Sequence, residues 1–184
     1  PPRGCWKPSG STAVAYDLVE RWTGLPLAAP DVPDVVRRYL RAFGPATAAD
    51  VTTWSGITRL GPVVKAMTDL EVHEDEDGKP LYDVPDAPLA DEDTPAPVRL
   101  FGTYDNLWLS HSARDRVMAP EHRRMWMGTN GAQAMSVHVD GWFAGLWRAE
   151  EGRVVIVDLV RDLTRAERAE LDEEIARTEA LLAR

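Results

Sequence analysis

Polar side chains that could do acid–base chemistry are concentrated in residues 104–116 (YDNLWLSHSARDR), which include Asp105, Asn106 and His111. General acid–base catalysis needs a carboxylate or an imidazole within hydrogen-bond reach of a substrate. If residues 106–109 form a strand, Asp105 and His111 lie at its two ends. The structural alternative, which is commoner, is that Asp105 caps a turn while the nearby arginines pair with acids. We therefore treat this cluster as a polar group of unassigned role and predict no catalytic residue.

Six basic side chains are candidate contacts to DNA. Four of them surround His122 and Trp126, and cations beside aromatic rings can hold phosphates and stack bases. The other two lie on or near a helix expected after Pro62, where a recognition helix would read a groove. The six are Arg59, Lys65, Arg114, Arg116, Arg123 and Arg124. The alternatives are solvated surface charge for the cations and core filling for the tryptophan and the methionines around it.

Metal and cofactor chemistry has no support in the sequence. The four histidines show no HxH or HxxxH spacing, and with one cysteine, Cys5, a zinc site is not expected. Ser110 beside His111 lacks the glycines of a nucleophile elbow. Neither a P-loop nor a dinucleotide-binding fingerprint occurs. We predict no metal and no cofactor.

The composition is that of a folded chain. Its 184 residues, 44% of them hydrophobic and seven of them tryptophan, are enough to bury a core. The single Cys5 cannot form an internal disulfide, so a reducing cytoplasm is the expected location. No apolar run approaches membrane length, so no membrane partner is expected. Because the first residue is proline rather than methionine, we expect a fragment or a processed product.

The net charge of −9 is localised. Residues 71–93 hold ten acidic side chains and one lysine, so this segment accounts for the whole net charge and the remainder is balanced. Affinity for duplex DNA rests on cations that displace counterions. Glu74, Asp75, Glu76 and Asp77 should therefore repel phosphate, so the segment either points away from DNA or belongs to a module with a structural role.

Two helices joined by a tight corner are expected within residues 35–56. An apolar stripe of helical period runs from Val35 to Phe43, and Gly44-Pro45 ends that helix. Thr47 is placed to cap the second helix, with Asp50 three residues later. A third helix from Pro62 and a hairpin around Asp77-Gly78 follow. Three helices and a hairpin indicate a winged helix over residues 31–84.

The rest of the chain divides into three segments. Residues 1–30 are predicted to be a hairpin and a short helix, a remnant of an upstream module, and residues 85–97 an acidic, proline-rich linker. Residues 98–184 contain candidate strands, the last a VVIVDLV run expected to be buried on both faces, and a final helix whose capping box pairs Thr164 with Glu167. The predicted fold class is α+β: a winged helix followed by a small, mostly antiparallel β-barrel-like domain with a C-terminal helix.

Four stretches together resemble one bacterial family: the leading PPRG, RYLRAFGPATAADVTTWSG, PAPVRLFGTYDNLWLSHSARDRV and VDGWFAGLWR. This winged-helix DNA-binding family includes DNA glycosylases that act on alkylated bases and unhook interstrand crosslinks. The resemblance covers nearly the whole chain and implies the last winged helix and the C-terminal barrel of a longer protein. The family's catalytic signature, a Gln-x-Asp or related pair, lies in an N-terminal region. The only glutamine here, Gln133, precedes Ala134 and Met135, so this chain alone is expected to be inactive.

Three functions follow as hypotheses. The resemblance favours the C-terminal DNA-binding and scaffold portion of a DNA-repair glycosylase, which would bind double-stranded DNA weakly and mainly within the longer protein. The second hypothesis is a structural or protein-interaction module without a nucleic-acid role. The third is a hydrolase, which would need a pocket joining Asp105 to His111. Arginines clustered beside the third helix would support the first hypothesis, and arginines paired with the acids of residues 71–93 the second.

Overall fold

The computed structural model describes residues 16–128 and 133–183 and divides the chain into two units, Pro1–Val32 and Pro33–Arg184. The hairpin expected within residues 1–15 lies outside the described residues. The short helix predicted before Gly24 is present as α1 (Val19–Thr23), and Gly24 ends it in the left-handed conformation, with φ at 69°. No helix in the described part of the chain is long and apolar enough to cross a membrane.

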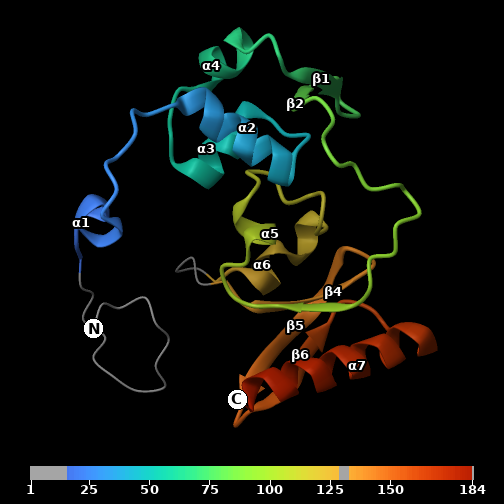
Figure 1. The fold of residues 1–184 in the computed structure, drawn as a ribbon. Helices are drawn as coiled ribbons and strands as arrows, with labels where there is room; N and C mark the ends of the chain where they lie inside the picture. The colour runs from blue at the N-terminus through green and yellow to red at the C-terminus, as the bar shows by residue number, and fades with distance from the viewer. Residues whose placement is uncertain (1–15, 129–132, 184) are drawn as a thin grey trace. The chain divides into compact units, whose positions relative to one another are not determined.

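Three helices open the second unit: α2 (Val32–Phe43), α3 (Ala48–Ser55) and α4 (Leu60–Ala66) (Figure 1). The apolar stripe predicted for α2 is confirmed, because Val36, Tyr39 and Leu40 are its buried residues. The cap predicted for α3 is also present. Thr47 accepts a hydrogen bond from the backbone N–H of Asp50, and the Asp50 side chain accepts one from the backbone N–H of Thr47.

Two further details concern the packing of this helical region. Trp54 is 39% exposed, and its ring centroid lies 5.4 Å from that of Tyr39. Gly44 does not adopt the left-handed conformation typical of a helix C-cap. Glycine is needed there because an added Cβ would meet the Asp83 carboxylate and the Leu40 carbonyl oxygen.

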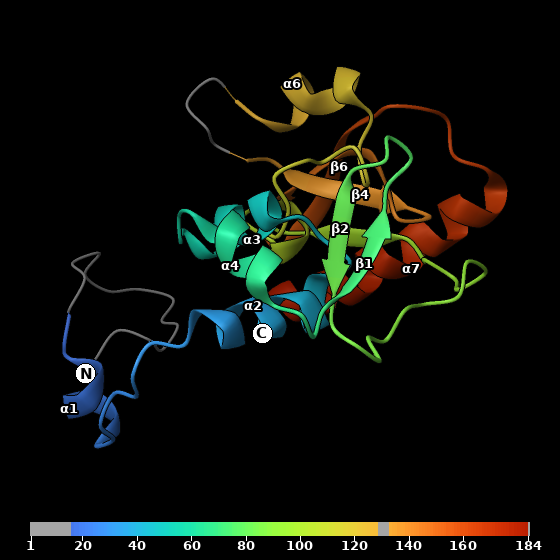
Figure 2. The same cartoon turned by 90° about the horizontal axis from the view of Figure 1, so that it is seen from above.

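An antiparallel hairpin follows the helices. Strand β1 (Glu71–Glu74) pairs with β2 (Pro80–Asp83), and Gly78 in the turn has φ at 75°, as the Asp-Gly signal predicted (Figure 2). A backbone bridge between Ala46 and Tyr82 ties β2 to the corner between α2 and α3. We call residues 71–83 the acidic hairpin, and residues 32–84 the helical part.

The remainder, residues 98–182, forms what we call the sheet part. Its four strands are β3 (Arg99–Phe101), β4 (Met135–Val139), β5 (Trp142–Glu150) and β6 (Arg153–Leu159), and they pair antiparallel in that order. The sheet is open, so the expectation of a β-barrel-like domain is wrong, although the mixed α+β class and the antiparallel pairing are present.

The physical reason lies in residues 106–109, which were expected to form a strand. They form a short helix, α5 (Asn106–Leu109), because the Asp105 carboxylate accepts a hydrogen bond from the N–H of Leu107 and caps the turn. With β3 only three residues long, four strands cannot close into a barrel. Helices cover the two faces of the sheet instead.

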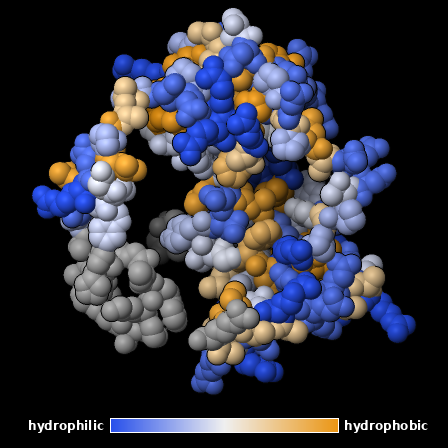
Figure 3. Space-filling view, viewed as in Figure 1, coloured by the Kyte–Doolittle hydropathy of each residue, from blue (hydrophilic) through white to orange (hydrophobic). Residues whose placement is uncertain are grey.

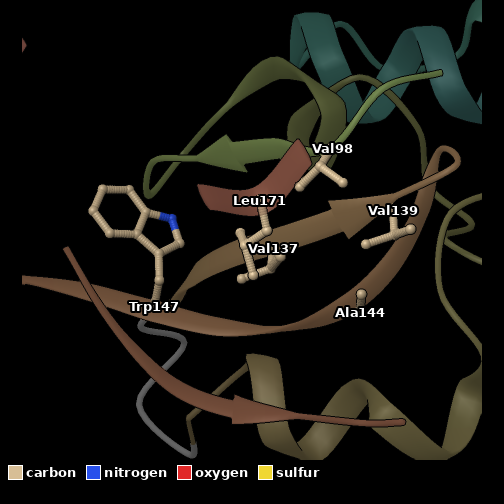
Figure 4. Packing of buried hydrophobic residues seen from close by; sticks show 6 residues of the cluster. All are labelled: Val98, Val137, Val139, Ala144, Trp147 and Leu171. Carbon is tan, nitrogen blue, oxygen red and sulfur yellow. The ribbon is translucent and has the colours of Figure 1, made fainter. Parts of the chain in front are cut away.

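On one face lies α7 (Arg165–Leu182), which runs along the sheet (Figure 1). Leu171 from α7 packs against Val137 and Trp147 from the strands in a buried cluster (Figure 4). The capping box predicted for this helix is confirmed, because Thr164 and Glu167 exchange both hydrogen bonds. Leu182, the last residue of α7, is exposed.

The other face is covered by α5, the 3₁₀ turn η1 (Pro120–His122) and α6 (Arg123–Trp126). The rings of Trp108 and Trp126 are stacked, with centroids 4.2 Å apart, and Phe143 completes this second core. The Nε1–H of Trp108 donates to the Ser136 hydroxyl over 3.1 Å. Burial lowers the pKa of the neighbouring His138 to about 4, so this imidazole is neutral at physiological pH.

Strand β6 contradicts the prediction of a strand buried on both faces. Among the described strands it pairs with β5 alone, at the edge of the sheet, and Val157 is 48% exposed. Val154 and Ile156 pack on the cluster beneath α7. The apolar run therefore reflects one covered face and one partly open face.

Candidate nucleic-acid interface

The polar cluster of the sequence analysis lies where the sheet part meets the helical part. Asp105 caps α5, and Asn106 is exposed at its first turn. The backbone carbonyl of Ser110 accepts a 2.6 Å hydrogen bond from the Tyr39 hydroxyl of α2. Burial, followed by the negative charge of Asp50, raises the pKa of Tyr39, so its hydroxyl stays protonated. The segment that follows α5 is therefore a junction between two parts of the fold.

Asp50 is the centre of this junction. Its Oδ2 accepts from the backbone N–H and the hydroxyl of Thr47, over 2.8 and 2.7 Å. Its Oδ1 accepts from the backbone N–H and the hydroxyl of Ser112, over 2.8 and 2.7 Å. Burial alone would raise the pKa of Asp50, but these four hydrogen bonds outweigh it and lower the pKa to about 2. The carboxylate is therefore charged and fully engaged.

His111 is held by both ring nitrogens. Its Nε2 lies 3.1 Å from the carbonyl oxygen of Phe43, and its Nδ1 lies 3.0 Å from the Ser110 hydroxyl oxygen. Since a carbonyl can only accept, Nε2 carries the proton and Nδ1 accepts from Ser110. Burial is the largest cause that lowers the pKa of His111. The imidazole is thus a neutral structural group whose nitrogens are both occupied.

A cavity of about 350 Å³ opens beside His111, between the end of α2 and α5. Phe43, Phe101, Leu107 and Arg116 are among its lining residues, whereas Asp105 is not. This cavity therefore does not join Asp105 to His111, as the hydrolase hypothesis would require. The cavity itself remains a concave, largely apolar feature next to a cation.

The Arg114 side chain is half-buried and makes its contacts within the protein. Its guanidinium donates to the carbonyl oxygens of Ser112 and Trp108, over 3.2 and 3.0 Å, and lies 5.6 Å from the centroid of the Trp126 ring. Burial and then the positive charge of Arg123 lower the pKa of Arg114. This arginine pairs with backbone carbonyls rather than with the acids that the structural alternative named.

The remaining predicted cations are exposed. Arg116 donates to the Pro45 carbonyl over 3.0 Å, which anchors it beside the corner between α2 and α3. Arg123 and Arg124 lie on α6, whereas Arg59 and Lys65 lie at the start and in the last turn of α4. Arg59 itself is in the left-handed conformation, with φ at 62°.

The structure thus brings Arg114 and Arg123 together on the sheet part and leaves Arg59 and Lys65 on the helical part. Within the described residues, none of the six candidate cations forms an ion pair with an acid of residues 71–93.

Sequence reasoning identified Asp50 only as a capping residue. Its second partner, Ser112, is 62 positions away, and no local pattern signals that contact. No group of three or more potential metal-ligating side chains occurs in the described residues.

Comparisons with known proteins give one consistent result. A family model described as DNA glycosylase AlkZ-like matches residues 1–181. An interstrand DNA cross-link repair glycosylase of Streptomyces sahachiroi is 27% identical over 143 residues, which is 73% of this chain and 38% of the relative. The solved structure of Streptomyces sahachiroi DNA glycosylase AlkZ matches with a TM-score of 0.65 and 24% identity, over 80% of this chain and 43% of that one. The chain therefore spans less than half the length of each of these two relatives.

Proposed function

The chain belongs to the AlkZ-like DNA glycosylase family, and on that premise we propose that it is a DNA-binding and scaffolding portion of a DNA-repair glycosylase. The observation that carries this proposal is the family match over residues 1–181. Its expected partner is double-stranded DNA, bound weakly and mainly within the longer protein. We assign no catalytic residue, so base excision belongs to the proposed longer protein rather than to this chain alone.

We interpret residues 31–84 as a winged helix. The order α2, α3, α4, β1 and β2 supports this interpretation, because three helices followed by a two-stranded hairpin is the order of that fold. In such a module the third helix faces the groove. Here that helix is α4, and its Arg59 and Lys65 are exposed and have no acidic partner among the described residues.

The charge layout supports a shallow, mostly sequence-independent contact. Phosphate binding uses cations whose donors are not already satisfied by acids. Arg59, Lys65, Arg123 and Arg124 meet this condition, whereas Arg114 is engaged with two carbonyls. The acidic hairpin opposes DNA on its own side. We therefore infer few phosphate contacts, made by α4 with its N-cap Arg59 and by α6.

The test compares two variants that remove the same charge. One carries glutamine at the four exposed, unpaired cations, which are Arg59, Lys65, Arg123 and Arg124. The control carries glutamine at four arginines that already pair with acids, which are Arg148, Arg153, Arg161 and Arg177. Fluorescence anisotropy with a labelled duplex at low salt should show at least a roughly tenfold loss of affinity for the first variant only. Equal losses would mean that net charge alone matters, and would overturn the assignment of these four contacts.

A protein-interaction module without a nucleic-acid role is the second candidate. It is favoured by the acids of residues 71–93, for which the described chain shows one close side-chain contact with a basic residue, the 3.7 Å distance from His73 Nε2 to a Glu71 carboxylate oxygen. Such a module would attract a basic partner through this segment. Its signature would be an absence of duplex binding even at low salt.

A further inference from the structure

The cavity beside His111 has the size and lining of a small-molecule site. At about 350 Å³ it falls within the roughly 300–1,000 Å³ typical of ligand pockets. It lies at the junction of the helical part and the sheet part, a common location for such pockets. Its volume suits one ring system with a substituent and excludes a helix or a strand of a partner.

Its lining combines apolar walls with a cation. Phe43, Phe101, Leu107 and Val117 supply the apolar surface, and Arg116 supplies the charge. Both phenylalanines are only partly buried, so part of each side chain stays accessible. Hydrophobic surface is visible around α5, below α2, in the space-filling view (Figure 3). Flat apolar surfaces of this kind suit the face of a planar ring.

The electrostatics favour an anionic substituent on that ring. The cavity lining contains no carboxylate. Two carboxylates lie behind the lining: Asp50, which is saturated by four hydrogen bonds, and the buried Asp83, which lies against Gly44 and accepts from the N–H of Val84. The His111 nitrogens are both occupied. Arg116 is exposed and uses Nη1 for the Pro45 carbonyl, so the rest of its guanidinium can donate to a ligand.

We propose that this cavity binds one unstacked nucleotide of a DNA strand, with the base between the apolar walls and a phosphate at Arg116. This inference rests on the proposed function, because DNA binding is what brings the nucleotide to the cavity. Every base has a π face, so such a site accepts a base without reading its identity. Because Ser110, His111 and Arg116 are fixed by hydrogen bonds, the cavity is preformed and binding costs little reorganisation. An aromatic side chain of a partner protein would fill the walls but leave Arg116 unused.

The experiment compares a matched duplex with the same duplex carrying a one-nucleotide bulge. Stacking of one extra base should make the bulged duplex bind roughly tenfold more tightly in fluorescence anisotropy. Two variants, Ala42→Phe and Ala113→Phe, fill the cavity from exposed lining positions, so at least one should fold normally. Each folded variant should abolish the preference for the bulge and leave affinity for the matched duplex unchanged.

The contribution of Arg116 is tested in the same way. Arg116→Met should remove most of the preference for the bulge, whereas Arg168→Met, which removes an exposed charge from α7 on the other sheet face, should keep it. A parallel NMR titration with thymidine monophosphate should shift the methyl signals of Leu107 and Val117. Thymidine without the phosphate should shift them less at equal concentration.

The outcomes separate this inference from the proposed function. Equal binding of the two duplexes, unchanged by either cavity-filling variant, would overturn the inference and leave the proposed function intact. Binding of neither duplex at low salt would overturn the proposed function. If thymidine monophosphate shifts the methyl signals but the bulged duplex binds no more tightly than the matched one, the cavity binds free nucleotides. That result would contradict the proposal that its ligand is a nucleotide of a DNA strand. Shifts with N-acetyltryptophanamide but not with thymidine monophosphate would assign it to a protein side chain and equally overturn the proposal.

Discussion

A single carboxylate, Asp50, joins two parts of the fold that are far apart in sequence. It completes the capping box of α3 through Thr47 and holds the segment after α5 through Ser112. The capping role could be predicted, because a threonine three residues before an acid is a local pattern. The contact to Ser112 could not, because it depends on how the helical part and the sheet part pack. The same holds for the contacts of His111 and Arg114 with backbone carbonyl oxygens, which no side-chain pattern reveals.

Replacing Asp50 by asparagine should destabilise the protein by about 2 kcal/mol at neutral pH, because a shift of one pKa unit corresponds to about 1.4 kcal/mol. The folded-state pKa of about 2 lies below the ordinary value of 3.8, so the stabilisation is present above pH 4 and is lost as the pH falls towards 2. Urea unfolding of both proteins between pH 7 and 2 measures this difference.

The gap in unfolding free energy between the original chain and Asp50→Asn should therefore shrink below pH 4. Asp172→Asn, an exposed change on α7, serves as the control and should leave stability nearly unaltered. A gap that stays constant down to pH 2, or is absent at pH 7, would contradict the role given to Asp50.

At the scale of elements, local turn and cap chemistry was the most reliable guide. The helices before and after Gly44-Pro45, the Asp-Gly hairpin and the capped final helix all appear where the sequence indicates them. The errors are of one kind. Residues 106–109 carry an apolar pattern that suits a strand, but the Asp105 cap makes them a short helix. The apolar run of β6 lies at the sheet edge, with one face covered and the other partly open. Apolar periodicity alone does not say what covers a face.

The corner after α2 gives a second prediction. Gly44→Ala should cost about 2 kcal/mol, because the new Cβ would meet the Asp83 carboxylate and the Leu40 carbonyl. Gly61→Ala is the matched control, because Gly61 also precedes a proline and no atom beyond its chain neighbours lies within 4 Å of an added Cβ, so it should cost less than about 1 kcal/mol. Thermal unfolding of the two variants measures both effects. Similar melting temperatures for the pair would show that the approach of Asp83 to Gly44 is not tight.

The acidic hairpin gives a third prediction. Neutralising the acidic side chains at its tip should strengthen duplex binding by relieving repulsion. Asp75 is changed to asparagine, whose side-chain oxygen can still accept from the N–H groups of Asp77 and Lys79. The hairpin variant changes Glu74, Asp75, Glu76 and Asp77 to their amides. The control variant makes the same change at four exposed acids elsewhere, which are Glu151, Asp162, Asp172 and Glu173.

If the hairpin lies near the duplex, its variant should bind roughly threefold more tightly than the control variant, measured by anisotropy at one fixed salt concentration. Equal affinities for the two variants would place the hairpin away from DNA. That result would leave the winged-helix interpretation without support from its wing.

At the scale of the whole molecule, the family was recognisable from four stretches of sequence, and the match over residues 1–181 establishes it. The fold class was predictable only as far as α+β and antiparallel. The barrel was an inference from the candidate strands of residues 98–184, which the family resemblance also implied, and the open four-stranded sheet described here does not bear it out. The cations scatter over α4, α6 and the segment before α6 rather than forming one dense patch, which is why we infer weak binding.

The most direct test of this account is the salt dependence of duplex binding. Each phosphate contact contributes about −0.9 to the slope of log affinity against log salt concentration. With two to four contacts, fluorescence anisotropy across a salt series should give a slope of roughly −2 to −4, with little dependence on sequence. No binding at the lowest salt would contradict a DNA-binding role, and a slope steeper than about −6 would contradict the small number of contacts.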